Sequence, residues 1–246
     1  MCRLLGYTSP TPITFADAVG KNFDQFVNLA NDHCDGWGIA TNENHHSSLY
    51  KEPVAATKSA HFKDQLASHK SDAALLHLRW ATEGMPVNEN NTHPFTYQGI
   101  SFIHNGSITP FNCLDTLIDS KFLQLAKGTT DSERFFLYLL TQIEKFGFIT
   151  GIKTGLSYIK NNCIFSSLNI IIINDETLIA ACIYNQDKIP AKFKNNQDYY
   201  QLKYTKHDGQ VVVASSGWDQ KNWIDIPNGS ALIVDRTEGK EILQKI

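Results

Sequence analysis

Hydrophobic residues follow helical spacing in a few segments of the chain and strand spacing in most of the rest. Residues 13–32 carry aromatic and aliphatic side chains near helical spacing, which predicts an amphipathic helix. Residues 131–146 predict a second strong helix, with Asp131 and Ser132 as its cap. We also expect shorter helices at 57–68 and 151–160.

Short apolar runs bounded by turn residues predict strands over much of the remaining chain. The segment AALLHLRWAT is typical of a buried strand that opens into a loop, and GISFIHNG of a strand that ends in a glycine turn. Many strands with two sets of helices indicate an α+β protein whose sheets pack face to face under helical layers. The other expected strands are CRLLGY, GWGIAT, SSLYKE, SSLNIIIIN, TLIAACIYN, YYQLKYT, QVVVASS, SALIVD and KEILQ.

Composition narrows the class of protein. The 246 residues contain no repeat or linker, so we expect a single domain over residues 1–246. A net charge of -3 without a basic block argues against nucleic acid and against an anionic membrane as partners. No apolar run is long enough for a signal peptide or a membrane span. The five cysteines include no CxxC pair, which favours reduced thiols and a cytoplasmic location.

Cys2 directly follows the initiator methionine. If Met1 is removed, Cys2 carries a thiol and a free α-amine on adjacent carbons. The amine has a pKa of about 7.7–8.0, so it can take the thiol proton and later return it to a leaving amine. The alternative is a buried strand cysteine with no chemical role, because free cysteine is among the most buried residue types.

Three further motifs offer groups for the same chemistry, each with a plainer alternative. Arg79 stands where a strand opens and can fork onto a carboxylate, or can form a structural ion pair. Asn105 and Gly106 can donate two hydrogen bonds to an oxyanion, or can form a hairpin turn. Asp131 can bind a substrate ammonium group, or can cap a helix.

Metal and cofactor binding find little support in the sequence. His33, Cys34 and Asp35 are adjacent, but no second cluster has ligand spacing, so we expect no metal and no cofactor. The pair at 45–46 is expected in a solvated loop. His93 precedes a proline, and either lines the substrate pocket or caps a loop.

Taken together and in this order, the motifs resemble the class II glutamine amidotransferases, which belong to the N-terminal-nucleophile hydrolase superfamily. The resemblance spans about the first 140 residues, and a late VVVASSGW strand is similar to one that these enzymes carry. The motifs are Cys2, H-x-D-G-W-G at 33–38, H-x-R-W-A-T at 77–82, N-T-H-P-F at 91–95, H-N-G at 104–106 and T-D-S-E at 130–133.

This resemblance implies a four-layer αββα sandwich with two mainly antiparallel sheets. It implies hydrolysis of glutamine, or of a small γ-glutamyl amide, through a thioester on Cys2, with Asn105 and Gly106 as the oxyanion hole. By matching positions, Asp131 holds the substrate ammonium group. The positions that would hold its carboxylate end are Arg79, Trp80 and Thr82.

Two departures from the fused synthases of the family concern specificity. Those enzymes have a histidine after R-W-A-T, where this chain has Glu83, and their arginine-glycine start before the aspartate of the 33–38 motif is absent. The chain is more similar to stand-alone members, including relatives of the ergothioneine-pathway γ-glutamyl hydrolase. An ammonia-accepting synthase remains open as a partner.

Two rival functions stay open. One is an N-terminal-cysteine amidase of the penicillin or bile-salt kind, which acts on apolar acyl groups and needs no pair like Arg79 and Asp131. The other is a catalytically idle interaction subunit that retains the fold.

Overall fold

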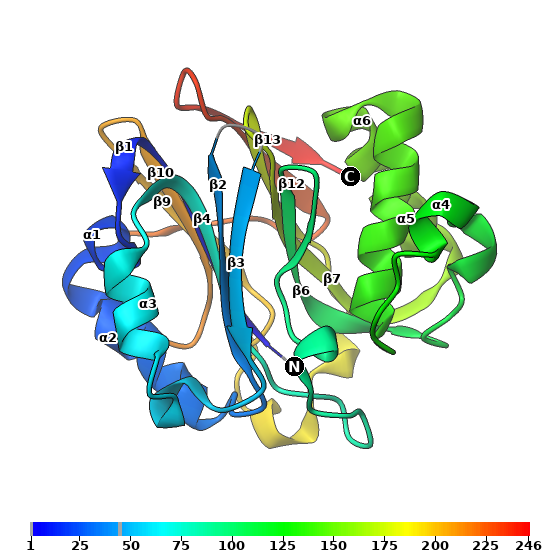
Figure 1. Ribbon diagram of the computed structural model, residues 1–246, viewed down its shortest axis with the longest axis horizontal. Helices are drawn as coiled ribbons and strands as arrows, with labels where there is room; N and C mark the ends of the chain where they lie inside the picture. The colour runs from blue at the N-terminus through cyan, green and yellow to red at the C-terminus, as the bar shows by residue number, and fades with distance from the viewer. Residues whose placement is uncertain (1, 44–45) are drawn as a thin grey trace.

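Two antiparallel sheets pack face to face in a computed structural model that describes residues 2–43 and 46–246 (Figure 1). The larger sheet has the strand order β11-β9-β10-β1-β4-β2-β3, and the smaller has β13-β12-β8-β7-β6-β5. The strands of the larger sheet are β1 Arg3–Ile13, β2 Trp37–Glu43, β3 His46–Glu52, β4 Ser71–Leu78, β9 Leu202–His207, β10 Gln210–Ser215 and β11 Ile224–Asp225. Those of the smaller are β5 Phe95–Tyr97, β6 Ile100–Thr109, β7 Ile164–Ile173, β8 Thr177–Cys182, β12 Ser230–Asp235 and β13 Lys240–Lys245.

Helices cover the outer face of each sheet (Figure 1). On one side lie α1 Phe15–Val19, α2 Phe23–Asn28 and α3 Phe62–Ser68, and on the other α4 Ser120–Leu123, α5 Asp131–Phe146 and α6 Phe148–Asn162. The expected α+β fold, a four-layer αββα sandwich, is therefore confirmed. Among the described residues, no helix has both the length and the apolar composition that a membrane crossing needs.

Alternation along the strands divides the hydrophobic core into three layers. Strand β1 shows the principle, because Leu4 faces the smaller sheet and Leu5 faces the helices α1–α3. Sheet residues such as Leu75 and Ile171 fill the layer between the sheets, and Phe102 packs under α5. Both faces of each central strand are thus buried. This burial specifies the register of the strands, and so it sets the positions of the strand ends, where the polar motifs lie.

Three local expectations are wrong. The helix predicted over 13–32 breaks into α1 and α2 because Gly20 adopts φ 75°, outside the helical region. The N-cap of α5 is Thr130, whose side chain accepts the Glu133 backbone N–H, and Asp131 is the first helical residue. Asn105 and Gly106 form no turn, because β6 continues through them and pairs with β7 as far as Thr109.

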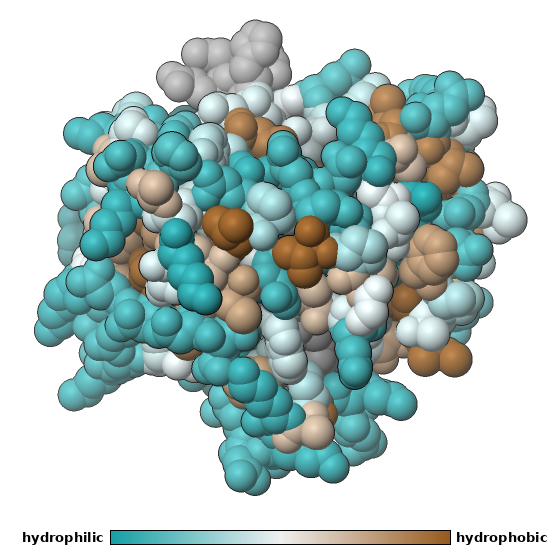
Figure 2. All heavy atoms as spheres, turned by 60° about the horizontal axis from the view of Figure 1, so that its bottom comes forward, coloured by the Kyte–Doolittle hydropathy of each residue, from teal (hydrophilic) through white to brown (hydrophobic). Residues whose placement is uncertain are grey.

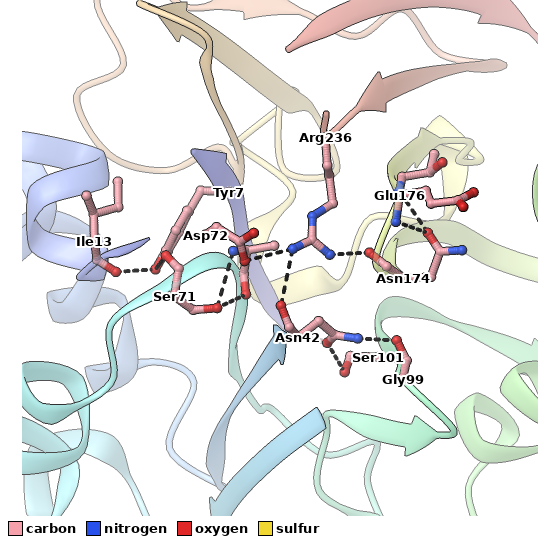
Figure 3. A network of polar contacts seen from close by, with 12 residues as sticks. Tyr7, Ile13, Asn42, Ser71, Asp72, Gly99, Ser101, Asn174, Glu176 and Arg236 are labelled. Atoms are coloured by element: carbon pink, nitrogen blue, oxygen red, sulfur yellow. Dashed lines mark hydrogen bonds and ion pairs between the residues drawn. The ribbon is translucent and has the colours of Figure 1, made fainter. Parts of the chain in front are cut away.

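A polar network closes the end of the sandwich remote from Cys2 (Figure 3). Arg236 donates to the Asp72 carboxylate at 2.8 Å, to the Asn42 carbonyl at 3.2 Å and to the Asn174 carbonyl. Tyr7 donates to the Ile13 carbonyl at 2.6 Å. These bonds join both sheets at the end where β1 finishes and β4 begins.

Candidate active site

Residues from most of the sequence motifs line one pocket at the end of the sandwich where β1 begins, although the motif at 33–38 contributes none. Cys2 precedes β1, and Arg79 follows the neighbouring antiparallel strand β4. The two residues therefore lie at the same end of the larger sheet. Gly106 comes from β6 of the facing sheet and Asp131 from the first turn of α5. The pocket is lined by Cys2, Arg79, Trp80, Ala81, Thr82, Met85, Asn91, His93, His104, Gly106, Thr130, Asp131 and Ser132.

Cys2 is anchored between the two sheets. Its backbone nitrogen donates to the Asn105 side-chain oxygen at 2.8 Å, and its sulfur lies 3.8 Å from the Trp80 carbonyl oxygen. The residue is 8% exposed, yet it lines the pocket. A thiol and a main-chain nitrogen therefore reach the same cavity from one residue.

Asn105 and Gly106 lie next to Cys2, Gly106 in the pocket lining and Asn105 behind it. The Asn105 side-chain oxygen accepts the Cys2 N–H, whereas its buried Nδ2 has no partner among the described residues. Gly106 is needed for a steric reason, since a Cβ there would stand 1.8 Å from the Ser167 carbonyl oxygen on β7. An unpaired buried amide is costly unless it serves a ligand, so the Nδ2 group is a candidate oxyanion donor.

Arg79 is held in place through backbone carbonyls. Its guanidinium donates to the carbonyls of Asp35 at 3.3 Å and Pro86 at 3.2 Å, and the residue is 4% exposed. The Asp35 carboxylate accepts the Ala81 N–H at 2.8 Å and so orders the loop that follows Arg79. Burial lowers the pKa of Arg79, but a guanidinium stays protonated in proteins and can fork onto a carboxylate.

Asp131 supplies the opposite charge. One carboxylate oxygen accepts the Ile108 N–H at 2.6 Å, just past an irregularity in the β6–β7 register. Burial raises the pKa of Asp131 from its ordinary value, while nearby His104 and backbone hydrogen bonds act to lower it. A buried carboxylate of this kind gains stability from a cationic ligand.

Trp80 and Thr82 line the same pocket from the loop after β4. The Trp80 ring packs edge-on against Phe193 at 5.4 Å, which fixes one wall. Thr82 is exposed at the mouth. His93 also lines the pocket, and neither of its ring nitrogens has a partner among the described residues.

Three buried histidines lie on or beside β6. Burial lowers the pKa values of His77, His93 and His104, so their rings are neutral near neutral pH. His104 lies 2.9 Å from the Ser132 hydroxyl through Nδ1 and 3.1 Å from the Ser167 carbonyl through Nε2. Because a carbonyl only accepts, Nε2 carries the proton, and the ring ties α5 to β7 across Gly106.

Sequence reasoning missed the residues that support the site. Asp35 and Asn91 both stand in sequence motifs, but the sequence assigns neither of them a role in the site. The Asn91 side chain accepts the Thr129 N–H at 2.8 Å and donates to the Pro86 carbonyl, so it links the loop after β4 to the loop before α5. The described residues contain no group of histidine, cysteine and acidic side chains that could hold a metal ion. His45 lies outside the described residues.

Comparisons with known proteins identify the family of this chain. The family model of class-II glutamine amidotransferases matches residues 1–244. A putative glutamine amidotransferase of Haemophilus influenzae is 32% identical over 75% of this chain and 64% of its own length. A probable glutamine amidotransferase of Saccharomyces cerevisiae is 27% identical over 60% of this chain and 47% of its own length. The chain thus matches between about half and two thirds of these two relatives.

Solved structures share the fold. A glutamine aminotransferase class-II domain protein from Silicibacter pomeroyi has a TM-score of 0.71 at 19% identity, over 100% of this chain and 99% of its own. A predicted glutamine amidotransferase from Pseudomonas aeruginosa has a TM-score of 0.58 at 21% identity, over 96% and 98%. With the family model spanning nearly the whole sequence and most of the motifs gathered in one pocket, this chain belongs to the class II glutamine amidotransferases.

Proposed function

We propose that the protein hydrolyses glutamine or a small γ-glutamyl amide through a thioester on Cys2. The observation that carries this proposal is the pocket that brings a thiol together with two opposite charges. Asn105, whose buried amide nitrogen has no partner among the described residues, contacts Cys2 from behind this pocket. A free amino-acid head group has a carboxylate and an ammonium. Arg79 and Asp131 are matched to those two charges.

The proposed reaction begins when the Cys2 α-amine takes the thiol proton and sulfur attacks the side-chain amide carbon. The carbonyl oxygen becomes an oxyanion, which accepts hydrogen bonds from Asn105 Nδ2 and the Gly106 N–H. The intermediate collapses, the C–N bond breaks, and the ammonium of Cys2 returns its proton to the leaving nitrogen. Water then attacks the thioester with the amine as base, which releases glutamate and restores the thiol.

The remaining pocket residues are proposed to orient the substrate. Arg79, with Trp80 and Thr82 beside it, holds the carboxylate end, and Asp131 holds the ammonium. His93, whose neutral ring has two unpartnered nitrogens, completes the polar wall. Burial raises the pKa of the Asp131 carboxyl above its ordinary value. As the pH falls through that raised pKa, the carboxylate is protonated and its binding of the substrate ammonium weakens.

Two features argue against the acyl-amidase rival. The pocket contains the charged pair Arg79 and Asp131, which an apolar acyl chain would leave unpaired at a cost of about 3–5 kcal/mol. The face on which the chain begins is covered mainly by hydrophilic side chains, with apolar residues in small separate spots (Figure 2). A polar amino-acid amide suits this surface better than a long apolar acyl chain.

A substrate panel tests the proposal. We expect release of glutamate from glutamine, or from γ-glutamyl amides with varied amine groups. N-acetyl-glutamine and glutamine esters should fail, because each removes one of the two charges. Comparable turnover of N-acetyl-glutamine and glutamine would move the assignment to the acyl-amidase. If no substrate of the panel is hydrolysed, with or without candidate synthase partners, the result would favour the catalytically idle interaction subunit.

Maturation gives a second test. The mechanism needs a free α-amine on Cys2, so we expect the active chain to begin at that residue. Intact-mass analysis of a fully active preparation that retains Met1 would falsify the mechanism.

A further inference from the structure

The thiols of Cys113 and Cys163 are in contact with one another, away from the pocket. Their sulfur atoms are 3.9 Å apart, although the two residues are 50 positions apart in the chain. Neither residue lines the pocket around Cys2. Each of the remaining cysteine sulfurs contacts an oxygen atom instead, and these are the sulfurs of Cys2, Cys34 and Cys182.

The two cysteines stand where the chain leaves the smaller sheet and where it returns. Cys113 lies in the turn that follows β6, and Cys163 lies between the end of α6 and the start of β7. Because β6 and β7 pair at Thr109 and Ile164, these two points are neighbours in space. The chain between them forms α4, α5 and α6, which cover the outer face of the smaller sheet (Figure 1).

The distance between the two sulfurs can close to a covalent bond. A disulfide is about 2.05 Å long, so the atoms must approach by about 2 Å. Rotation of one side chain about its Cα–Cβ bond moves a sulfur by more than this. Cys113 also lies in a turn, where its N–H donates to the Pro110 carbonyl at 3.0 Å, and so its backbone is not held in a sheet ladder. Both cysteines are partly exposed, which lets a small oxidant reach them.

The surroundings of the pair give the two thiols different parts in such a reaction. Burial, followed by the neighbouring Cys163, raises the pKa of Cys113 to about 12. Cys113 therefore keeps its proton and donates a weak hydrogen bond to the Cys163 sulfur. Because a thiolate is the attacking species in thiol–disulfide exchange, Cys163 should react first with an oxidant and Cys113 second.

We propose that Cys113 and Cys163 form a reversible disulfide when the protein meets a small-molecule disulfide such as glutathione disulfide. Cys163 gives up its proton and attacks one sulfur of the oxidant, whose S–S bond breaks, and the first glutathione takes that proton and leaves. Cys113 then attacks the Cys163 sulfur and gives its own proton to the second glutathione. The two protein thiols lose two electrons, which reduce one glutathione disulfide to two glutathiones. This modification does not depend on the proposed function.

Contact between the sulfurs favours the disulfide over two separate glutathione adducts. Once Cys163 carries a glutathione, the Cys113 sulfur is already beside it, so the second exchange is intramolecular and outcompetes a second molecule of glutathione. The bond would close the chain between positions 113 and 163 into a loop, and so restrict the unfolded state. We therefore expect oxidation to stabilise the helices that cover the smaller sheet, including α5 with Asp131 at its start.

Oxidation of the folded protein in a Cys2→Ala background tests the proposal, because the proposed nucleophile would otherwise react as well. The reduced protein is equilibrated with a series of glutathione redox buffers, free thiols are blocked with N-ethylmaleimide, and peptides are identified by mass. We expect a peptide pair joined through Cys113 and Cys163 and a rise in Tm of about 5 °C or more. Dithiothreitol should reverse both changes. Cys182, which is fully buried, should stay unmodified.

Single serine variants at three cysteines are the matched controls. Cys113→Ser and Cys163→Ser should gain no Tm on oxidation and carry at most one glutathione at the remaining thiol of the pair. Cys34→Ser removes an exposed thiol that contacts no other cysteine, so both the disulfide and the rise in Tm should remain. If a serine variant does not fold, the alanine variant takes its place. Free thiols at 113 and 163 throughout the series, separate glutathione adducts on both, or a disulfide that leaves Tm unchanged would overturn the proposal.

Discussion

The two ends of the sheet sandwich treat their buried polar groups differently. At the end where β1 finishes, the charge of Arg236 is paired with the Asp72 carboxylate, and two carbonyls accept from it, although its Nε has no partner among the described residues (Figure 3). At the end where β1 begins, the Asn105 amide nitrogen and both ring nitrogens of His93 have no partner in the part of the chain that the structure describes. One end therefore pairs its buried charge, and the other leaves several polar groups near a thiol without partners.

This difference between the two ends indicates which of them binds a ligand. Unsatisfied buried donors and unpaired charges destabilise a folded protein, so their concentration beside one thiol indicates groups kept for a ligand. The ion pair and hydrogen bonds of Arg236 instead contribute to stability. Substitutions at the end that holds Cys2 should change reaction rates, and substitutions around Arg236 should change the free energy of unfolding.

Cys2→Ala should have the largest effect. We expect hydrolysis to disappear while Tm stays close to the wild-type value, because no other thiol lines the pocket. Burial raises the pKa values of Cys113 and Cys182 to about 12, which makes them poor nucleophiles. Activity that persists in Cys2→Ala, with labelling by diazo-oxo-norleucine at another cysteine, would contradict the assignment.

Asp131→Asn should separate function from stability most clearly. The amide can still accept the Ile108 N–H but cannot attract an ammonium, so we expect kcat/KM to fall by about 10²-fold or more. The folded-state pKa of Asp131 is raised, so its ionisation costs stability as pH rises from the unfolded to the folded pKa. At neutral pH the variant should therefore be at least as stable as wild type by thermal unfolding. A marked loss of Tm with unchanged KM would instead indicate a helix-end role.

Asn105→Ala should lower kcat by about 10²–10³-fold with a smaller change in KM, as expected when one oxyanion donor is lost. The side chain also accepts the Cys2 nitrogen at 2.8 Å, so Asn105→Asp, which keeps that acceptor, is the informative partner variant. Steady-state kinetics of both should show similar losses. Recovery of kcat in the aspartate variant would assign Asn105 to anchoring Cys2 alone.

Arg236→Met should have the smallest effect on catalysis. Losing a partner of the half-exposed Asp72 should destabilise the protein by about 1–3 kcal/mol, measured by urea unfolding. Per folded molecule, kcat/KM should be unchanged. A catalytic defect that remains after correction for the folded fraction would mean that the two ends are coupled.

The sequence predicted those parts of the fold that depend on local pattern. Helix α5 has the bounds expected at 131–146, because its apolar periodicity is strong and Gly147 follows it. The helix expected at 13–32 failed because one residue, Gly20, adopts a conformation that periodicity cannot reveal. The turn expected at Gly106 failed because this glycine serves close packing against Ser167, which depends on a distant strand.

The candidate site divides in the same way. Cys2, Arg79 and Asp131 were found because each stands in a recognisable motif, and the structure brings them to one pocket. Their catalytic and binding roles stay predictions. Asp35 also stands in a motif, but its support of the loop after Arg79 could not be predicted, because it depends on a contact with Ala81 that forms only on folding.

The central claim, that Cys2 with its own amine is the nucleophile, is tested most directly by rapid-quench mass spectrometry of wild-type enzyme with substrate. The account predicts a chain that begins at Cys2 and carries a glutamyl group on that residue, which appears within one turnover and decays as glutamate accumulates. Hydrolysis without any such adduct, or an adduct on another residue, would contradict it.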